Sequence, residues 1–126
     1  MPDSPRILLV DDQPEMRRLL RRLMRREGYV LHVASSGKEA LALNQALHPA
    51  LLVLDCEMPG MDGSQILAAL REEGYRLPVI MASAHMDKSL AARLNTLGAN
   101  LCLSKLELGR RLAPAVASLL AGTPAG

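Results

Sequence analysis

The stretch ALLVLDCEMPGMDG, residues 50–63, decides the fold class of this chain. It begins with consecutive apolar residues at 50–54, and a short apolar run without alternation is typical of a strand buried on both faces. The run ends at Asp55, and the loop that follows contains Gly and Pro, which interrupt regular structure. The stretch therefore predicts a strand of a parallel sheet that carries a carboxylate at its carboxyl end.

Four further short apolar runs lie at residues 6–10, 29–34, 78–82 and 100–103. Longer segments with apolar residues at helical spacing separate the five runs. Strands that alternate with helices in this way predict the doubly wound α/β class, a five-stranded parallel sheet covered on both sides, with right-handed crossovers. Ligands of such sheets bind beyond the carboxyl ends of the strands, so functional residues are expected there.

The first two helices have clear boundary signals. The first is predicted to open with Pro14, which suits a first helical turn, and to end at Gly28. For the second, Ser36 followed by Glu39 predicts a capping box, and Pro49 forces the helix to end.

Glycines mark the ends of the next two helices, where Gly74 and Gly98 are predicted to serve as carboxyl-terminal caps. The last helical pattern covers residues 107–121 but contains Gly109 and Pro114. We therefore expect the last helix to start late or to kink at the proline.

Length and composition favour one domain over residues 1–126, with an ordered core at about residues 5–121 and a flexible tail at 122–126. The first apolar run is too short for a signal peptide and is followed at once by acids. No stretch reaches the roughly 18 apolar residues that would indicate a membrane span. A cytoplasmic protein with no membrane contact is therefore expected.

The cysteines and the net charge exclude some other classes. Cys56 and Cys102 stand in apolar surroundings without metal-ligand spacing, so we expect free thiols that contribute to packing. A formal charge of +2 is too small to indicate a nucleic-acid partner by itself.

Polar residues gather at the carboxyl ends of four predicted strands. They are Asp11 and Asp12 after the first strand, Asp55 after the third, Ser83 after the fourth, and Ser104 with Lys105 after the fifth. Any one of them could cap a helix, and this is a fair account of Asp12, because Pro14 follows it closely. Capping does not explain why three carboxylates and a lysine converge, since buried like charges repel each other unless they are neutralised.

A bound cation would resolve this repulsion. Carboxylate oxygens are hard ligands, and a few of them with water and phosphate suit Mg²⁺ better than Zn²⁺. A carboxylate beside Mg²⁺ can attack phosphorus, while a hydroxyl and an ammonium stabilise the phosphoryl oxygens. Asp55, Ser83 and Lys105 fit these three roles.

The motifs VDD at residues 10–12, DCEMPGMDG at 55–63 and MASA at 81–84, together with Lys105, resemble the receiver domain of two-component response regulators in order and spacing. The resemblance spans nearly the whole chain, and the chain is similar to stand-alone chemotaxis regulators. It implies a flavodoxin-like strand order 2-1-3-4-5 in three α/β/α layers. It also implies a phosphoprotein rather than an enzyme, one that takes phosphoryl from a histidine kinase or phosphotransfer protein and supports its own dephosphorylation.

Carried over residue by residue, the resemblance implies a role for each polar side chain of this edge. Asp55 would accept the phosphoryl group, which Ser83 and Lys105 would hold. Mg²⁺ would be bound by Asp12, Asp55 and the backbone carbonyl of Glu57, with Asp11 acting largely through water.

The chain departs from the family pattern beyond its fourth strand. Cys102 stands where relatives usually have the Tyr or Phe that moves inward on activation, so output is expected to rely on backbone or helix movement. Leu106 replaces the usual proline after Lys105, and we expect a trans peptide there, because cis costs roughly 3 kcal/mol without proline. With Gly109 and Pro114, these changes predict an atypical output surface.

Glu57 and His85 lie two residues beyond Asp55 and Ser83. In the family that this chain resembles, residues at these two positions border the path of the water that attacks the acyl phosphate. We predict that they set the lifetime of the phosphorylated state. The alternative is that both are exposed and inert.

Six arginines of the first predicted helix repeat on one face: Arg17, Arg18, Arg21, Arg22, Arg25 and Arg26. A solvated face is one interpretation, and an acidic docking surface of the kinase or phosphotransfer protein is the other. Direct nucleic-acid binding is weaker, because base-reading elements and stacking aromatic residues are missing from the sequence. We expect a monomer or weak dimer that contacts a downstream protein target.

Three other classes are alternatives to this interpretation. A Mg²⁺-dependent aspartyl-phosphate phosphatase of the haloacid-dehalogenase type needs D-x-D where Asp55, Cys56 and Glu57 stand, and a flavodoxin-like carrier needs a hydroxyl-rich loop and aromatic residues. The third class, an N-terminal receiver of a larger and for example DNA-binding regulator, stays open.

Overall fold

The computed structural model describes residues 4–25 and 28–122. Along the chain follow β1 (Arg6–Val10), α1 (Pro14–Met24), β2 (Val30–Ala34), α2 (Gly37–Leu47), β3 (Leu51–Asp55), α3 (Gly63–Glu72), β4 (Val79–Ser83), α4 (Lys88–Leu97), β5 (Leu101–Ser104), the 3-10 helix η2 (Lys105–Glu107) and α5 (Leu108–Leu120). All five predicted strands are confirmed to within one residue at either end. Of the predicted flexible tail, residues 123–126 lie outside the described part of the chain.

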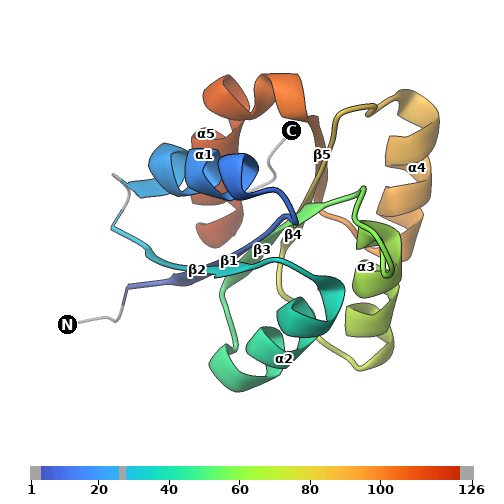
Figure 1. The fold of residues 1–126 in the computed structure, drawn as a ribbon, viewed down its shortest axis with the longest axis horizontal. Helices are drawn as coiled ribbons and strands as arrows, with labels where there is room; N and C mark the ends of the chain where they lie inside the picture. The colour runs from blue at the N-terminus through green and yellow to red at the C-terminus, as the bar shows by residue number, and fades with distance from the viewer. Residues whose placement is uncertain (1–3, 26–27, 123–126) are drawn as a thin grey trace.

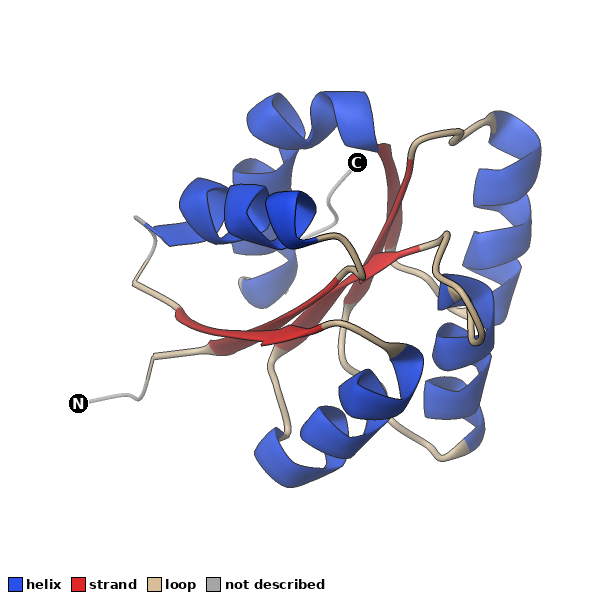
Figure 2. Cartoon of the chain, viewed as in Figure 1, coloured by secondary structure: helices blue, strands red, loops and turns tan. Residues whose placement is uncertain are grey.

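The strands form one parallel sheet in the order β2-β1-β3-β4-β5, which confirms the predicted topology. Helices α1 and α5 cover one face, and α2, α3 and α4 cover the other, with the sheet between the two helical layers (Figures 1 and 2). The three-layer doubly wound architecture is therefore also confirmed. Because the strands are parallel, the loops after β1, β3, β4 and β5 leave the sheet at the same edge.

The core has two halves, one on each face of the sheet. Ile7 and Leu9 of β1 pack with α1 and α5, whereas Leu8 and Val10 pack with α2, α3 and α4. All four side chains are fully buried. This explains why the central strands are apolar at consecutive positions, since each face of the sheet is covered by helices.

Two of the predicted helix starts are corrected in detail. The N-cap of α1 is Gln13, which makes no side-chain cap hydrogen bond, so the cap interpretation of Asp12 was wrong. Ser36 caps α2 as predicted, accepting from Glu39 N at 3.1 Å. The Glu39 carboxylate, however, accepts from Ser35 N at 2.6 Å, one residue before the cap.

The helix ends agree better with the sequence. α1 is helical to Met24, residues 26–27 lie outside the described part, and Gly28 has a φ of 74°. α2 ends at Leu47 and is followed by His48 and Pro49. Gly74 and Gly98 follow α3 and α4, and both have backbone angles in the left-handed region that glycine favours.

The expectation of a late start for the last helix was wrong. α5 begins at Leu108 and includes both Gly109 and Pro114. Leu108, Leu112 and Val116 are buried on one side of this helix, and their packing outweighs the local helix-breaking tendency. Pro114 has no N–H to donate to the carbonyl of Arg110, which is an exposed residue.

Within residues 4–25 and 28–122, no helix combines the length and the apolar character needed to cross a membrane.

Candidate functional site

The carboxyl edge of the sheet brings together the polar residues that the sequence singled out. Asp55 is the last residue of β3, and Ser83 is the last of β4. The register pairs Asp55 with Ala82 and Ser83 with Ser104, so neighbouring strands end at the same level. Asp11, Asp55 and Ser83 are at most 2% exposed.

Three carboxylates form the centre of this edge. One oxygen atom from each of Asp11, Asp12 and Asp55 lies within 4.8 Å of the others. Lys105 reaches into the cluster, with its Nζ 3.2 Å from Asp11 Oδ2 and 3.0 Å from Asp55 Oδ1. One ammonium against three carboxylates leaves two negative charges uncompensated, which is the charge balance that a divalent cation would complete.

The environment of Asp55 differs between its two oxygens. Oδ1 accepts from Lys105 and from Glu57 N at 3.2 Å, whereas Oδ2 is buried and has no hydrogen-bond partner among the described residues. Burial raises the pKa of Asp55 to about 6, with the charge of Asp11 adding to this and Lys105 opposing it. An unpartnered buried oxygen costs about 1–3 kcal/mol, so it marks a position where a ligand is expected.

Lys105 remains an ammonium in this setting. Burial alone would lower its pKa, but the carboxylates of Asp55 and Asp11 raise it above the ordinary value. A fixed positive charge therefore lies beside the unpartnered carboxylate oxygen.

The cluster fits a hard cation. In the described part of the chain its ligands are carboxylate oxygens, and one of them, Asp55 Oδ2, is buried without a partner there. Such ligands suit Mg²⁺, which takes one or two carboxylates and keeps water or phosphate in its other positions.

Ser83 has a partner that sequence reasoning missed. Its hydroxyl donates to Glu57 Oε2 at 2.5 Å, and Ala84 N donates to Glu57 Oε1 at 3.3 Å. His85 N donates to Ser83 Oγ at 2.9 Å, while the imidazole makes no hydrogen bond recorded in the described part. The sequence pattern placed Glu57 near this site, but the rotamer that brings its carboxylate to Ser83 leaves no signal in the sequence.

A second feature that sequence reasoning missed is the close approach at Gly63. A Cβ at this residue would overlap the backbone oxygen of Asp55. The amide of Gly63 donates to Cys56 O at 3.0 Å, which folds the loop back over the end of β3. Gly63 thus keeps the start of α3 tight against Asp55.

The two cysteines, including Cys102 at the atypical position, lie in partly buried surroundings. Cys102 is half-buried, with its Sγ 3.9 Å from Ala91 O and from Asn95 Oδ1 of α4. Burial raises the pKa of Cys102, and burial with the charges of Glu57 and Asp55 raises that of Cys56 to about 12. Both cysteines are free thiols, as expected, and protonated at neutral pH.

The peptide between Lys105 and Leu106 is trans, as predicted, since no cis peptide occurs in the described ranges. The side chain of Leu106 is 94% exposed beside the site.

The arginine face is not uniform. Arg17 Nη1 donates to the backbone oxygen of Asp11 at 2.9 Å, so this arginine supports the loop that carries the acids. Four others, Arg18, Arg21, Arg22 and Arg25, are exposed, and Arg26 lies outside the described residues.

Comparison with known proteins identifies this arrangement. Residues 7–117 match the family model of the response regulator receiver domain. The chain belongs to this family, whose members receive signals in two-component systems and bind Mg²⁺ at an acidic aspartate cluster.

Individual relatives differ in overall length. Regulatory protein AtoC of Escherichia coli is 36% identical over 94 residues, which cover 75% of this chain but only 20% of AtoC. An uncharacterized 14.6 kDa protein in the sodA1 3' region of Leptolyngbya boryana is 44% identical over 92 residues, 69% of this chain and 70% of the relative.

Among solved structures, a two-component response regulator of the LuxR family from an Aurantimonas species superimposes with a TM-score of 0.89 at 29% identity. The match covers 96% of this chain and 88% of that chain. The fold of the site is therefore that of a receiver domain.

Proposed function

We propose that this chain is a phosphorylation-controlled receiver in which Asp55 accepts a phosphoryl group from a phosphohistidine of a histidine kinase or phosphotransfer protein. The observation that carries the proposal is the buried, unpartnered Oδ2 of Asp55 beside Lys105 and two further carboxylates. This oxygen has the position and the free lone pairs of a nucleophile.

In the proposed step, Asp55 attacks phosphorus, the new bond from its oxygen forms, and the bond from phosphorus to the donor imidazole nitrogen breaks with its electron pair left on nitrogen. Lys105 is already 3.0 Å from Asp55 Oδ1 and would neutralise charge on the phosphoryl oxygens. Ser83 would donate its hydroxyl to another of these oxygens once it leaves Glu57.

The residues proposed to hold Mg²⁺ are Asp12, Asp55 and the backbone carbonyl of Glu57, with Asp11 acting largely through water. Bound there, Mg²⁺ would supply Lewis-acid neutralisation of the charge that builds up on the phosphoryl group. Asp11 would also keep Lys105 in place through the 3.2 Å contact. His85 and Glu57 are proposed to influence how fast water removes the phosphoryl group.

The partner surface is proposed to include the exposed arginines of α1. Three exposed guanidinium groups on α1, with that of Arg25 directly after the helix, favour an acidic docking face on the kinase or phosphotransfer protein. Phosphotransfer from such a donor should weaken with added salt and with the double variant Arg21→Glu/Arg22→Glu, while Arg76→Glu, an exposed arginine in another region, leaves it unchanged. Equal losses in both variants would contradict docking at α1.

The output is proposed to be protein contact by a cytoplasmic chain that is a monomer or weak dimer and acts without its own catalytic turnover of other molecules. The small relative from Leptolyngbya boryana favours a stand-alone receiver. The much longer AtoC favours the second candidate, a receiver that forms part of a larger regulator.

Intact mass after incubation with acetyl phosphate tests the phosphoacceptor directly. The wild type should gain one phosphoryl group only with Mg²⁺, and Asp55→Asn should gain none. Asp87→Asn is the matched control, because it removes an exposed carboxylate while Asn can still cap α4. Uptake by Asp55→Asn, or none by wild type in Mg²⁺, would overturn the proposal.

A further inference from the structure

Glu57 occupies the hydrogen-bond donors that a phosphoryl group on Asp55 would need. Its two carboxylate oxygens accept from the Ser83 hydroxyl at 2.5 Å and from Ala84 N at 3.3 Å. Ser83 ends β4, directly beside the end of β3 that carries Asp55. A hydroxyl has one hydrogen to donate, so Ser83 cannot serve Glu57 and a phosphoryl oxygen at the same time.

The arrival of a phosphoryl group would also repel Glu57. It adds about two negative charges close to a carboxylate that is already there. Like charges at this separation raise each other's free energy, and the flexible Glu57 side chain is the one that can move. Glu57 itself is exposed, so the path out of the site is open.

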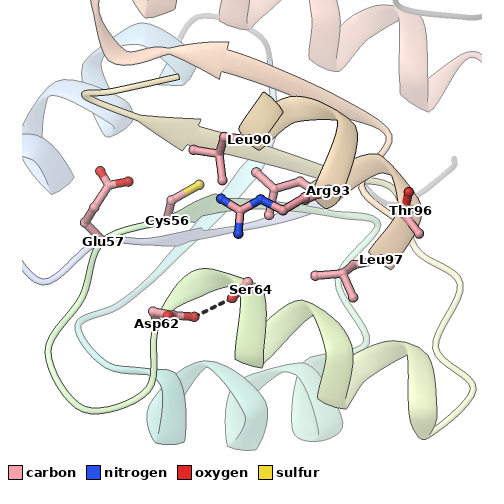
Figure 3. Close-up of a pocket in the computed structure, with 9 residues that line it drawn as sticks. Cys56, Glu57, Asp62, Ser64, Leu90, Arg93, Thr96 and Leu97 are labelled. Atoms are coloured by element: carbon pink, nitrogen blue, oxygen red, sulfur yellow. Dashed lines mark hydrogen bonds between the residues drawn. The ribbon is translucent and has the colours of Figure 1, made fainter. Parts of the chain in front are cut away.

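Glu57 borders a pocket of about 650 Å³ between the start of α3 and the side of α4 that carries Leu90, Arg93 and Leu94 (Figure 3). Arg93 of α4 lines the same pocket, and its guanidinium points into it. Within the described part of the chain, no hydrogen bond or ion pair is recorded for Arg93. The pocket thus contains an exposed guanidinium that forms no ion pair with another described residue.

The other acid in this pocket is already committed. Asp62 accepts from Ser64 Oγ at 2.7 Å and from Gln65 N at 3.0 Å, which caps α3. Releasing Asp62 toward Arg93 would remove the cap, whereas releasing Glu57 would not disturb a helix end. Glu57 is therefore the better partner for Arg93.

We propose that Glu57 is a two-position switch, which holds Ser83 and Ala84 in the resting state and moves to Arg93 when Asp55 is phosphorylated. The inference rests on the proposed function of Asp55. It gives α4 a direct electrostatic connection to the site. Arg93 thereby pairs with Glu57 only when Asp55 is phosphorylated.

Binding of beryllofluoride with Mg²⁺, used as the phosphoryl mimic, separates the two positions. Glu57→Ala frees Ser83 and should tighten mimic binding several-fold. Arg93→Ala should weaken it about two- to fivefold in the wild-type background, the range for an exposed ion pair. In the Glu57→Ala background, Arg93→Ala should have no effect, because its partner is absent. Arg76→Ala is the control and should have no effect in either background.

Amide chemical shifts of α4 provide the second readout. On mimic binding, residues 88–97 should shift in wild type and in Arg76→Ala, and these shifts should collapse in Arg93→Ala. An equal Arg93→Ala effect in both backgrounds, no effect in either, or persistent α4 shifts would overturn the switch. If wild type takes up phosphoryl but Arg93 is independent of Glu57, only this inference fails. If wild type binds no mimic and gains no phosphoryl group, the proposed function fails with it.

Discussion

The two edges of the sheet treat their polar groups in opposite ways. At the amino edge, Arg71 donates to Gly98 O at 2.7 Å, to Tyr75 O at 2.8 Å and to Asn100 Oδ1 at 3.2 Å. Asn100 Oδ1 also accepts from Val79 N at 2.9 Å. This guanidinium is half-buried and satisfied by neutral acceptors, so the amino edge is built for stability.

At the carboxyl edge, by contrast, three carboxylates face one lysine, and Asp55 Oδ2 has no hydrogen-bond partner in residues 4–25 and 28–122. This arrangement lowers the stability of the free protein, and a cation or a phosphoryl group would relieve it. Within this fold, unsatisfied polar groups therefore distinguish the reactive edge from the structural one.

The largest expected effect comes from changing the close approach at the reactive edge. Gly63→Ala should cost about 3 kcal/mol or more, because its Cβ would overlap the Asp55 backbone. The matched control is Gly109→Ala, where the added Cβ meets no described atom within 4 Å apart from its chain neighbours and the nearby backbone of its own helix. A helical alanine should stabilise by about 0.5–1 kcal/mol. Urea unfolding measures both, and similar values for the two variants would contradict the packing argument.

A second effect is the pH dependence that Asp55 adds to stability. Its pKa in the fold is about 6, above the ordinary 3.8, so the folded state keeps a proton that the unfolded chain releases. Stability from this group is therefore lost as pH rises from about 4 to about 6, by about 2–3 kcal/mol without metal.

The difference in unfolding free energy between Asp55→Asn and wild type isolates this contribution. It should grow across that pH range in a metal-free buffer and stay level above it. A difference that is independent of pH would show that burial does not penalise the Asp55 charge.

At the structural edge, Arg71→Ala should destabilise the protein by about 2 kcal/mol, because the acceptors of the guanidinium lose their donor. Arg71→Lys should recover only part of this, since one ammonium cannot reproduce the planar fork. Acetyl phosphate uptake by the folded variants should be unchanged. Loss of uptake without loss of stability would contradict the division between the two edges.

Sequence reasoning predicted the features that depend on residue type and order. The five apolar runs, their parallel order through the family resemblance, and the convergence of Asp11, Asp55 and Lys105 follow from strand ends that meet at one edge. The predictions that were wrong concern helix ends, where local sequence preference competes with packing. The N-cap of α1 is Gln13 rather than Asp12. α5 continues through Pro114, because the buried Leu108 and Leu112 pack this helix against the core.

Side-chain rotamers account for the rest. The contact between Glu57 and Ser83 joins residues that are 26 positions apart, and other rotamers of Glu57 would point to solvent. The overlap that requires Gly63 is likewise a matter of distances in the folded chain. Neither could be read from spacing alone.

The central claim is that the carboxylates of the reactive edge are arranged to bind a cation. The most direct measurement is the unfolding free energy of wild type and Asp55→Asn at neutral pH, each with and without Mg²⁺. Mg²⁺ at ten times its Kd should stabilise wild type by about 1.4 kcal/mol and Asp55→Asn much less, while Asp55→Asn is the more stable protein without metal. Equal stabilisation of both proteins by Mg²⁺, or a less stable Asp55→Asn in its absence, would contradict this account.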